Sequence, residues 1–159
     1  LLAHGLGAAA VRAAQPEAQI SIALNRGAVR AFSSDPADQD AARRVDGLLN
    51  RLFLDPIMGA GYPQDVVADT AHLSDWSFVH GQDLDVIATG LDVLGVNYYQ
   101  PDLVGAAVEP VTGPWCFPGS RRLAFHPSRA REPPWAGAST RPGCRRSCSG
   151  SGATIRTCR

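Results

Sequence analysis

Apolar and polar positions in the first part of the chain predict helices that alternate with strands. Four apolar residues recur at helical spacing near the N-terminus: Leu2, Leu6, Ala9 and Ala13. Pro16 ends this pattern, and a short strand follows over residues 19–25. Three of its apolar side chains share one face: Ile20, Ile22 and Leu24. Residues 25–27 are typical of a turn. A helix, a tight loop and a buried strand are half of a βαβ unit, which predicts an α/β fold.

A longer helix is predicted to begin at Ser34, Asp35 and Pro36. Ser34 or Asp35 can accept a hydrogen bond from a first-turn N–H, and Pro36 suits the first helical position. Five apolar side chains form one stripe along this helix: Val45, Leu48, Leu49, Leu52 and Phe53. The stripe indicates packing against a sheet rather than a cofactor site. We expect the helix to end before Pro56, because proline removes a backbone donor and crowds the preceding turn.

A strand over residues 91–99 begins with apolar residues and ends with polar ones. Short helices are predicted before it, over 63–71 and 83–88. Alternation along the strand places Asn97 and Tyr99 on the same face. In a parallel barrel the C-terminal ends of the strands carry the site residues, although polar residues also occur inside barrel cores. Taken alone, the pattern favours a barrel-core position for both side chains.

Charge and composition change after about residue 110. Residues 1–110 hold 6 arginines and 14 acidic residues, a net charge of −8, whereas residues 111–159 hold 9 arginines and 1 glutamate, a net charge of +8. The second part also holds all four cysteines and shows neither helical nor strand periodicity. The sequence therefore predicts two regions, a folded part over 1–110 and an irregular Arg/Pro/Cys-rich tail over 111–159.

A basic tail with cysteines can bind nucleic acid or zinc or form disulfides, and the sequence argues against each. Cys144 and Cys148 have no second cysteine pair, and His126 is the only histidine of the tail, so we expect no metal site. Nothing marks the chain as secreted, which disfavours a disulfide framework. Nucleic-acid binding needs aromatic residues on an ordered platform, which the tail does not predict. No run of 18 apolar residues occurs, so we expect no membrane span.

Four segments, in the same order, resemble family 1 glycoside hydrolases, the β-glucosidase family. Residues 91–99, which end in Gly-Val-Asn-Tyr-Tyr, are similar to the sixth barrel strand of that family. Residues 40–63 are similar to its segment Asp-Gly…Asn-Arg-Trp-Phe-x-Asp-Pro…Tyr-Pro, residues 1–5 to its fourth helix and residues 20–25 to its fifth strand. Four ordered matches over about 100 residues are more specific than any single motif.

The resemblance implies an α/β fold that is part of a (β/α)₈ barrel, from about helix four to strand six, followed by the irregular tail. It also implies retaining hydrolysis of β-linked glucosides, which needs two carboxyl groups about 5–5.5 Å apart. In the family the acid/base glutamate lies in Asn-Glu-Pro and the nucleophile in Thr-Glu-Asn-Gly, and this chain contains neither motif. We therefore expect an internal piece of such an enzyme, without a catalytic residue of its own and inactive alone.

The resemblance also assigns supporting site residues. Tyr99 would donate a hydrogen bond to the nucleophile carboxylate, Asn97 would face the site, and Asn25 would lie near the same barrel mouth at the end of the fifth strand. No cofactor is implied, and the expected ligand of the parent enzyme is a small β-glycoside, not nucleic acid or a membrane. We expect a location in the bacterial cytoplasm, and the sequence predicts no particular oligomeric state.

The tail resembles the same family only in another reading frame. If the codons for residues 153–159 are read in a frame that starts at the third base of the first codon, they can spell Asp-Tyr-Pro-Asp-Leu-Pro. This resembles a segment just before the family's nucleophile strand. Residues 133–137 in that frame can spell Ala-Met-Gly-Trp, a motif between strands six and seven. We therefore expect a frameshift between about Pro110 and Pro133. The alternatives are a non-catalytic truncated or pseudogene product and, less favoured, an Arg-rich nucleic-acid-binding protein.

Overall fold

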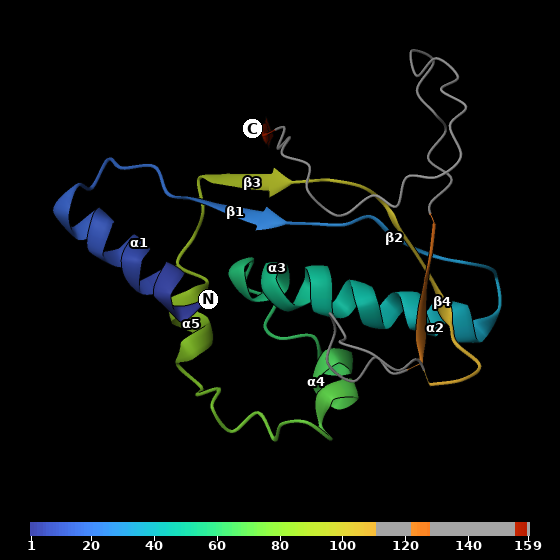
Figure 1. Ribbon diagram of the computed structural model, residues 1–159. Coiled ribbons are helices and arrows are strands. Elements are labelled where there is room, and N and C mark those ends of the chain that lie inside the picture. The colour runs from blue at the N-terminus through green and yellow to red at the C-terminus, as the bar shows by residue number, and fades with distance from the viewer. Residues whose placement is uncertain (111–121, 128–154, 159) are drawn as a thin grey trace, which may run out of the picture.

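The computed structural model describes residues 1–110 and 122–127, and the backbone of residues 155–158. The described residues alternate between helices and strands (Figure 1). The helices are α1 (Leu2–Ala14), α2 (Pro36–Asp46), the π-helix η1 (Gly47–Arg51), α3 (Leu52–Ile57), α4 (Gln64–Thr70) and α5 (Asp83–Ile87). The strands are β1 (Ser21–Asn25), β2 (Val29–Ala31), β3 (Val93–Asn97), β4 (Asp102–Ala106), β5 (Leu123–His126) and β6 (Ile155–Cys158). The mixed α/β class predicted from the sequence is confirmed.

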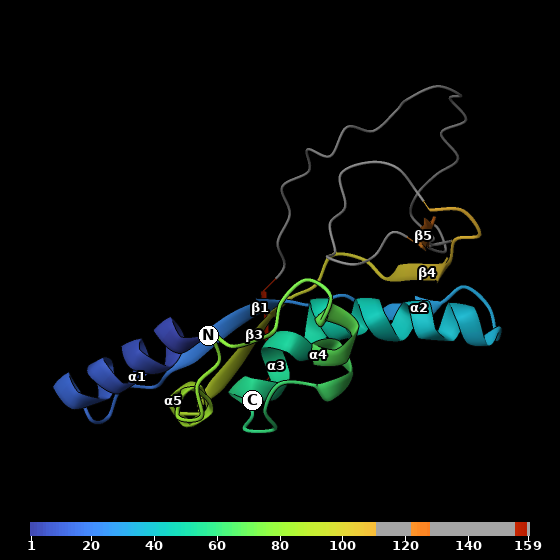
Figure 2. The ribbon, with the colours of Figure 1, turned by 90° about the horizontal axis from the view of Figure 1, so that it is seen from below.

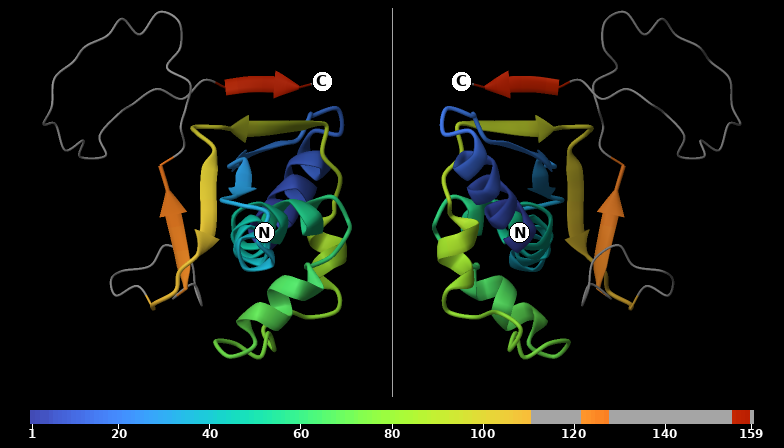
Figure 3. Two further views of the ribbon diagram at one scale, coloured as in Figure 1. Left: turned by 90° about the vertical axis from the view of Figure 1, so that its right-hand side faces the viewer. Right: turned by 90° about the vertical axis from the view of Figure 1, so that its left-hand side faces the viewer.

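The strands form two three-stranded sheets, in the orders β1-β3-β6 and β2-β4-β5. β1 pairs with β3 and β2 pairs with β4, both in parallel, while β6 pairs with β3 and β5 with β4 in antiparallel fashion (Figure 3). Two parallel strands need a long crossover connection between them, and the helices α2 to α5 lie between β1 and β3 in the sequence. Neither sheet closes on itself within the described residues, so this part of the chain forms no complete barrel.

α2, η1 and α3 follow one another directly and form one long helical segment. The predicted start is correct, because the Asp35 carboxylate accepts from Ala37 N at 2.8 Å and Pro36 is the first residue of α2. The predicted end is wrong, because α3 continues through Pro56 to Ile57. Pro56 lies in the last turn, so it removes few helical bonds, and the helix gains the burial of Pro56 and Ile57 in return.

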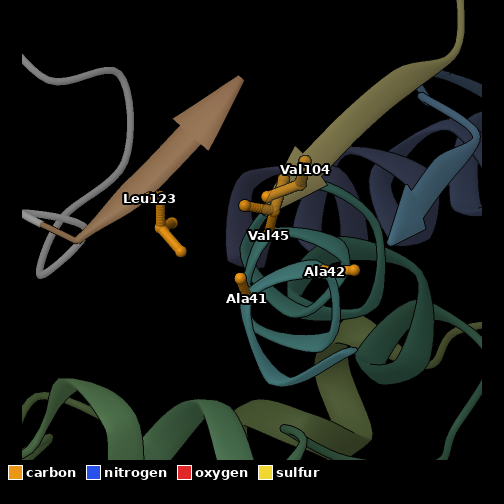
Figure 4. Close-up of a cluster of buried hydrophobic side chains, with 5 residues drawn as sticks. All are labelled: Ala41, Ala42, Val45, Val104 and Leu123. Atoms are coloured by element: carbon orange, nitrogen blue, oxygen red, sulfur yellow. The ribbon is translucent and has the colours of Figure 1, made fainter. Parts of the chain in front are cut away.

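The core cluster lies between α2 and the second sheet. Figure 4 shows Ala41 and Val45 of α2 on the side of the helix toward Val104 of β4 and Leu123 of β5, and Ala42 on the side away from Leu123. Val45 and Val104 have no exposed surface, and α2 packs against both β2 and β4 (Figure 2). Burial against the sheet therefore fixes the orientation of this helix.

The expectation of an irregular tail over 111–159 is wrong at β5 and β6. Leu123 is buried to 3% exposure in the core, and β5 pairs along β4 from Leu103 to Ala106. Both strands contain four residues, too few for an alternating pattern to be recognised. They form because β5 can pair with the free edge of β4, and β6 with the free edge of β3. The other tail residues lie outside the described part of the chain.

α1 packs against α5 through small residues rather than through its large apolar ones. Gly5 and Ala8 are buried, whereas Leu2 and Leu6 are 39% and 61% exposed. A Cβ atom at Gly5 would overlap the backbone carbonyl of Val86 on α5. The helical spacing of the apolar residues therefore identified the helix but not its contact face.

Replacing Gly5 by alanine should destabilise the chain, because the backbone of α5 must move to admit the methyl group. We expect a loss of about 1–3 kcal/mol in the free energy of unfolding. Gly7 is the matched control, since it is exposed on the same helix and a Cβ atom added there would meet no other part of the chain within 4 Å. Gly7→Ala should gain about 0.5–1 kcal/mol from helix propensity. Urea unfolding of both variants measures the two effects, and equal effects would contradict this packing.

None of the helices in the described ranges is long and apolar enough to cross a lipid bilayer.

Candidate functional site

β1 and β3 end side by side, and their last residues are the asparagines singled out from the sequence. Asn25 lies opposite Asn97 in the parallel register, and both strands point the same way (Figure 1). Asn97 Nδ2 donates to Asn25 Oδ1 at 3.0 Å, which joins the half-buried Asn97 to the exposed Asn25. The structure therefore brings both predicted residues together at the C-terminal ends of parallel strands, where α/β folds place their sites.

The turn expected at residues 25–27 is wrong, because the chain continues from β1 towards β2. Arg26 N donates to Asn97 O at 3.0 Å, and Asp102 N donates to Ala28 O at 3.0 Å. These bonds extend the contact between the two chain segments beyond the ends of β1 and β3. β2 itself, only three residues long, was not predicted.

A cavity of about 240 Å³ opens at these strand ends. Its lining includes Asn25 from β1, Tyr99 from the segment after β3, Leu49 from η1, and Asp102 at the start of β4. Tyr99 is 64% exposed in this chain, so its ring is not part of the described core. The cavity thus combines an amide, a phenol and a carboxyl group, all suited to binding hydroxyl groups.

Asp102 is the cavity residue that the sequence did not single out. Burial raises the pKa of its carboxyl group above the usual aspartate range, because the charged form loses contact with water. It lies at the start of β4, a strand that the sequence pattern did not predict. The signal that could have identified it is its place only five residues after Asn97.

An ion-pair network joins α4 to α2 and η1. Arg51 binds the Asp65 carboxylate with two nitrogens, at 2.8 and 2.6 Å, and Arg43 binds the same carboxylate at 2.7 Å. The hydrogen bonds from Arg51, followed by those from Arg43, hold the pKa of Asp65 well below its usual range. The network therefore fixes α4 against the helical segment that carries Leu49 and its neighbours.

Stability should depend on the charge of Asp65. Because its folded-state pKa is depressed, its contribution is fully present above the unfolded value of about 3.9 and is lost as the pH falls through the folded value. Asp65→Asn lacks this titration. The difference in unfolding free energy between wild type and Asp65→Asn should therefore be constant above about pH 5 and shrink at lower pH. Chemical unfolding at several pH values measures the difference, and a difference that grows on acidification would contradict the assignment.

The described strand ends contain no pair of carboxylates suited to acid and nucleophile roles. Among the three glutamates of the sequence, Glu17 precedes β1, Glu109 follows β4, and Glu132 lies outside the described residues. Within the described residues, no three histidine, cysteine, aspartate or glutamate side chains are grouped to hold a metal ion. Cys144 and Cys148 lie outside the described part, so the structure does not test the sequence argument about zinc.

Comparison with known proteins identifies the family. The model of glycosyl hydrolase family 1 matches residues 1–114. A bifunctional beta-D-glucosidase/beta-D-fucosidase of Bifidobacterium breve is 43% identical over 110 residues, which are 69% of this chain and 23% of that protein. Thermostable beta-glucosidase B of Thermobispora bispora is 34% identical over 128 residues, 79% of this chain and 25% of that protein.

A solved structure gives the same result. The crystal structure of the psychrophilic beta-glucosidase BglU from Micrococcus antarcticus superimposes with a TM-score of 0.68 and 37% sequence identity, over 78% of this chain and 29% of that one. The chain thus spans about a quarter of the length of these relatives. The resemblance identified from residues 1–99 is confirmed: the chain belongs to glycosyl hydrolase family 1.

Proposed function

We propose that residues 1–110 supply part of the β-glycoside site of a retaining β-glucosidase, and that the chain alone does not catalyse hydrolysis. The observation that carries this proposal is the pair Asn25 and Asn97, joined at 3.0 Å at the ends of two parallel strands. Tyr99 lines a cavity together with Asn25. The names of the relatives, which are β-glucosidases, support the substrate class.

The proposed roles follow from the chemistry of these groups. Each asparagine amide can both donate to and accept from a sugar hydroxyl, so the pair suits binding and orientation rather than proton transfer. The phenol of Tyr99 can donate to a carboxylate nucleophile and favour its ionised form. Retaining hydrolysis consumes only water besides the glycoside, so the proposal includes no cofactor and no metal.

The proposal places β1 as the fifth strand and β3 as the sixth strand of a parallel barrel, with α1 as the fourth helix. The order of these elements and the parallel register of β1 with β3 support this range. A location in the bacterial cytoplasm stays a prediction, as does the oligomeric state.

A graft tests the proposed function. The matching segment of the Bifidobacterium breve enzyme is replaced by residues 1–110 of this chain, which leaves the remaining barrel to that protein. We expect this chimera to hydrolyse an aryl β-glucoside and to release sugar that is initially the β-anomer, as retention requires. Proton NMR of the first product identifies the anomer. A folded chimera without turnover, or one that releases the α-anomer first, would contradict the proposal.

We also propose that residues 111–159 come from a shifted reading frame. The family match ends at residue 114, inside the interval between Pro110 and Pro133 where the sequence predicts the shift. A shifted frame accounts for the surplus of arginine without a nucleic-acid partner. Resequencing the gene across this interval tests the idea: an inserted or missing base is expected, and an undisturbed frame would leave the truncated, non-catalytic product as the better explanation.

A further inference from the structure

We infer that Asn50 is a positioning residue that fixes the end of β1 and thereby holds Asn25 beside Asn97. The inference deepens the proposed function, because it concerns the same strand ends. Asn50 lies on η1 and is only 3% exposed. Its position within the helical segment gave no sign in the sequence that it contacts the chain after a strand.

Asn50 binds both backbone groups of Gly27, two residues after the end of β1. Its Nδ2 donates to Gly27 O at 2.8 Å, and its Oδ1 accepts from Gly27 N at 3.3 Å. In a β-sheet, a neighbouring strand binds the backbone N–H and C=O of one residue in the same way. The side chain of Asn50 therefore takes the place of a strand partner just where β1 ends, and it prevents the segment from sliding or twisting.

Gly27 lies so close to its surroundings that only glycine fits without a shift. A Cβ atom there would lie 2.8 Å from Leu49 Cδ2 and 2.9 Å from an Asp102 carboxylate oxygen. Both neighbours belong to the lining of the cavity that contains Asn25 and Tyr99. The contact with Asn50 therefore fixes the backbone of Gly27, which itself lines this cavity.

The orientation of the Asn50 amide is fixed in turn by Asp46. Asn50 Nδ2 donates to Asp46 Oδ1 at 2.7 Å, and the other oxygen of Asp46 accepts from Arg51 Nε at 3.1 Å. A carboxylate only accepts, so the NH₂ group must face Asp46 and the amide oxygen is left for Gly27 N. Since Arg51 also binds Asp65 on α4, a continuous series of hydrogen bonds connects α4 to the end of β1.

Asn50→Asp in the 159-residue chain tests this role with little change in shape. The aspartate keeps an acceptor for Gly27 N but loses both donors, and it places a second carboxylate beside Asp46. At about pH 7.5 the two charges repel each other, and a lower pH favours a proton shared between the adjacent carboxylates. That proton restores the hydrogen bond to Asp46 but not the donor to Gly27 O, so acidification should reverse the defect in part.

The side-chain amide signals of Asn25 and Asn97 in ¹H–¹⁵N spectra provide the readout. In Asn50→Asp we expect both signals to move at about pH 7.5 and to return toward their wild-type positions at lower pH. Exchange of the Gly27 amide should accelerate about tenfold in Asn50→Ala, which removes its acceptor, and less in Asn50→Asp, which keeps an acceptor oxygen. In Asn50→Ala, which cannot regain a donor, the shifts should persist at both pH values.

The amide of Ala106 is the control, because it donates to Asp38 at 2.8 Å in the other sheet. Its exchange should be unaffected by either Asn50 variant. Unmoved Asn25 and Asn97 signals in Asn50→Asp, or recovery of Asn50→Ala on acidification, would overturn the inference. Equal acceleration at Ala106 would also overturn it, since Asn50 would then support global stability. None of these readouts requires turnover, so an inactive chimera would refute the proposed function while leaving the positioning role intact.

Discussion

The purified 159-residue chain should hydrolyse aryl β-glucosides no faster than buffer alone. Retaining hydrolysis divides its work between a nucleophile and an acid/base, and general acid–base catalysis alone typically contributes about 10²–10⁴-fold. The described strand ends and the cavity beside them offer three amides, a guanidinium, a phenol and the single carboxyl group of Asp102. Release of nitrophenol as a function of protein concentration measures the activity, and turnover proportional to concentration would contradict the prediction.

Asp102→Asn is the matched control for that measurement. Asp102 is the carboxyl group of the described cavity, and burial raises its pKa, which favours the protonated form more than in an exposed aspartate. If the chain shows activity that Asp102→Asn abolishes, a single carboxyl group suffices for slow hydrolysis and the requirement for a pair is wrong here. The active chimera serves as the positive control under the same conditions.

Tyr99→Phe in the chimera should lower kcat strongly without lowering the melting temperature. The substitution removes one hydroxyl group and almost no volume, and the ring is 64% exposed in this chain, so little packing is at stake. Losing one oriented donor to developing charge costs about 2.7–4 kcal/mol of transition-state stabilisation, or about 10²–10³-fold in kcat. Steady-state kinetics and thermal unfolding of the same preparation separate the two effects.

Tyr98→Phe provides a matched comparison. Tyr98 is the neighbouring residue, is 50% exposed, and is expected to face away from Asn97 and Tyr99 if the alternation of β3 continues. It should therefore change kcat by less than about threefold, the scale of an ordinary surface substitution. An unchanged kcat in Tyr99→Phe, or a loss of stability in its place, would show that Tyr99 supports packing and that its assignment to the site is wrong.

The sequence by itself determined the elements whose signals are local. The Asp35 cap, the first helix and the two central strands follow from side-chain chemistry and spacing within a few residues. The order of motifs over about 100 residues also identified the family. The resemblance predicted that Asn25 and Asn97 lie near the same barrel mouth, and the parallel register of β1 and β3 places them opposite each other.

Only the tertiary structure decided the features that depend on distant neighbours. Gly5 rather than Leu6 faces α5, the helix continues through Pro56, and β5 forms on the free edge of β4. Asn50 meets Gly27 across 23 residues of sequence. Helix and strand periods describe which residues share a face, but not which face finds a partner. That choice depends on close packing and on satisfying buried polar groups, which exist only after the elements have come together.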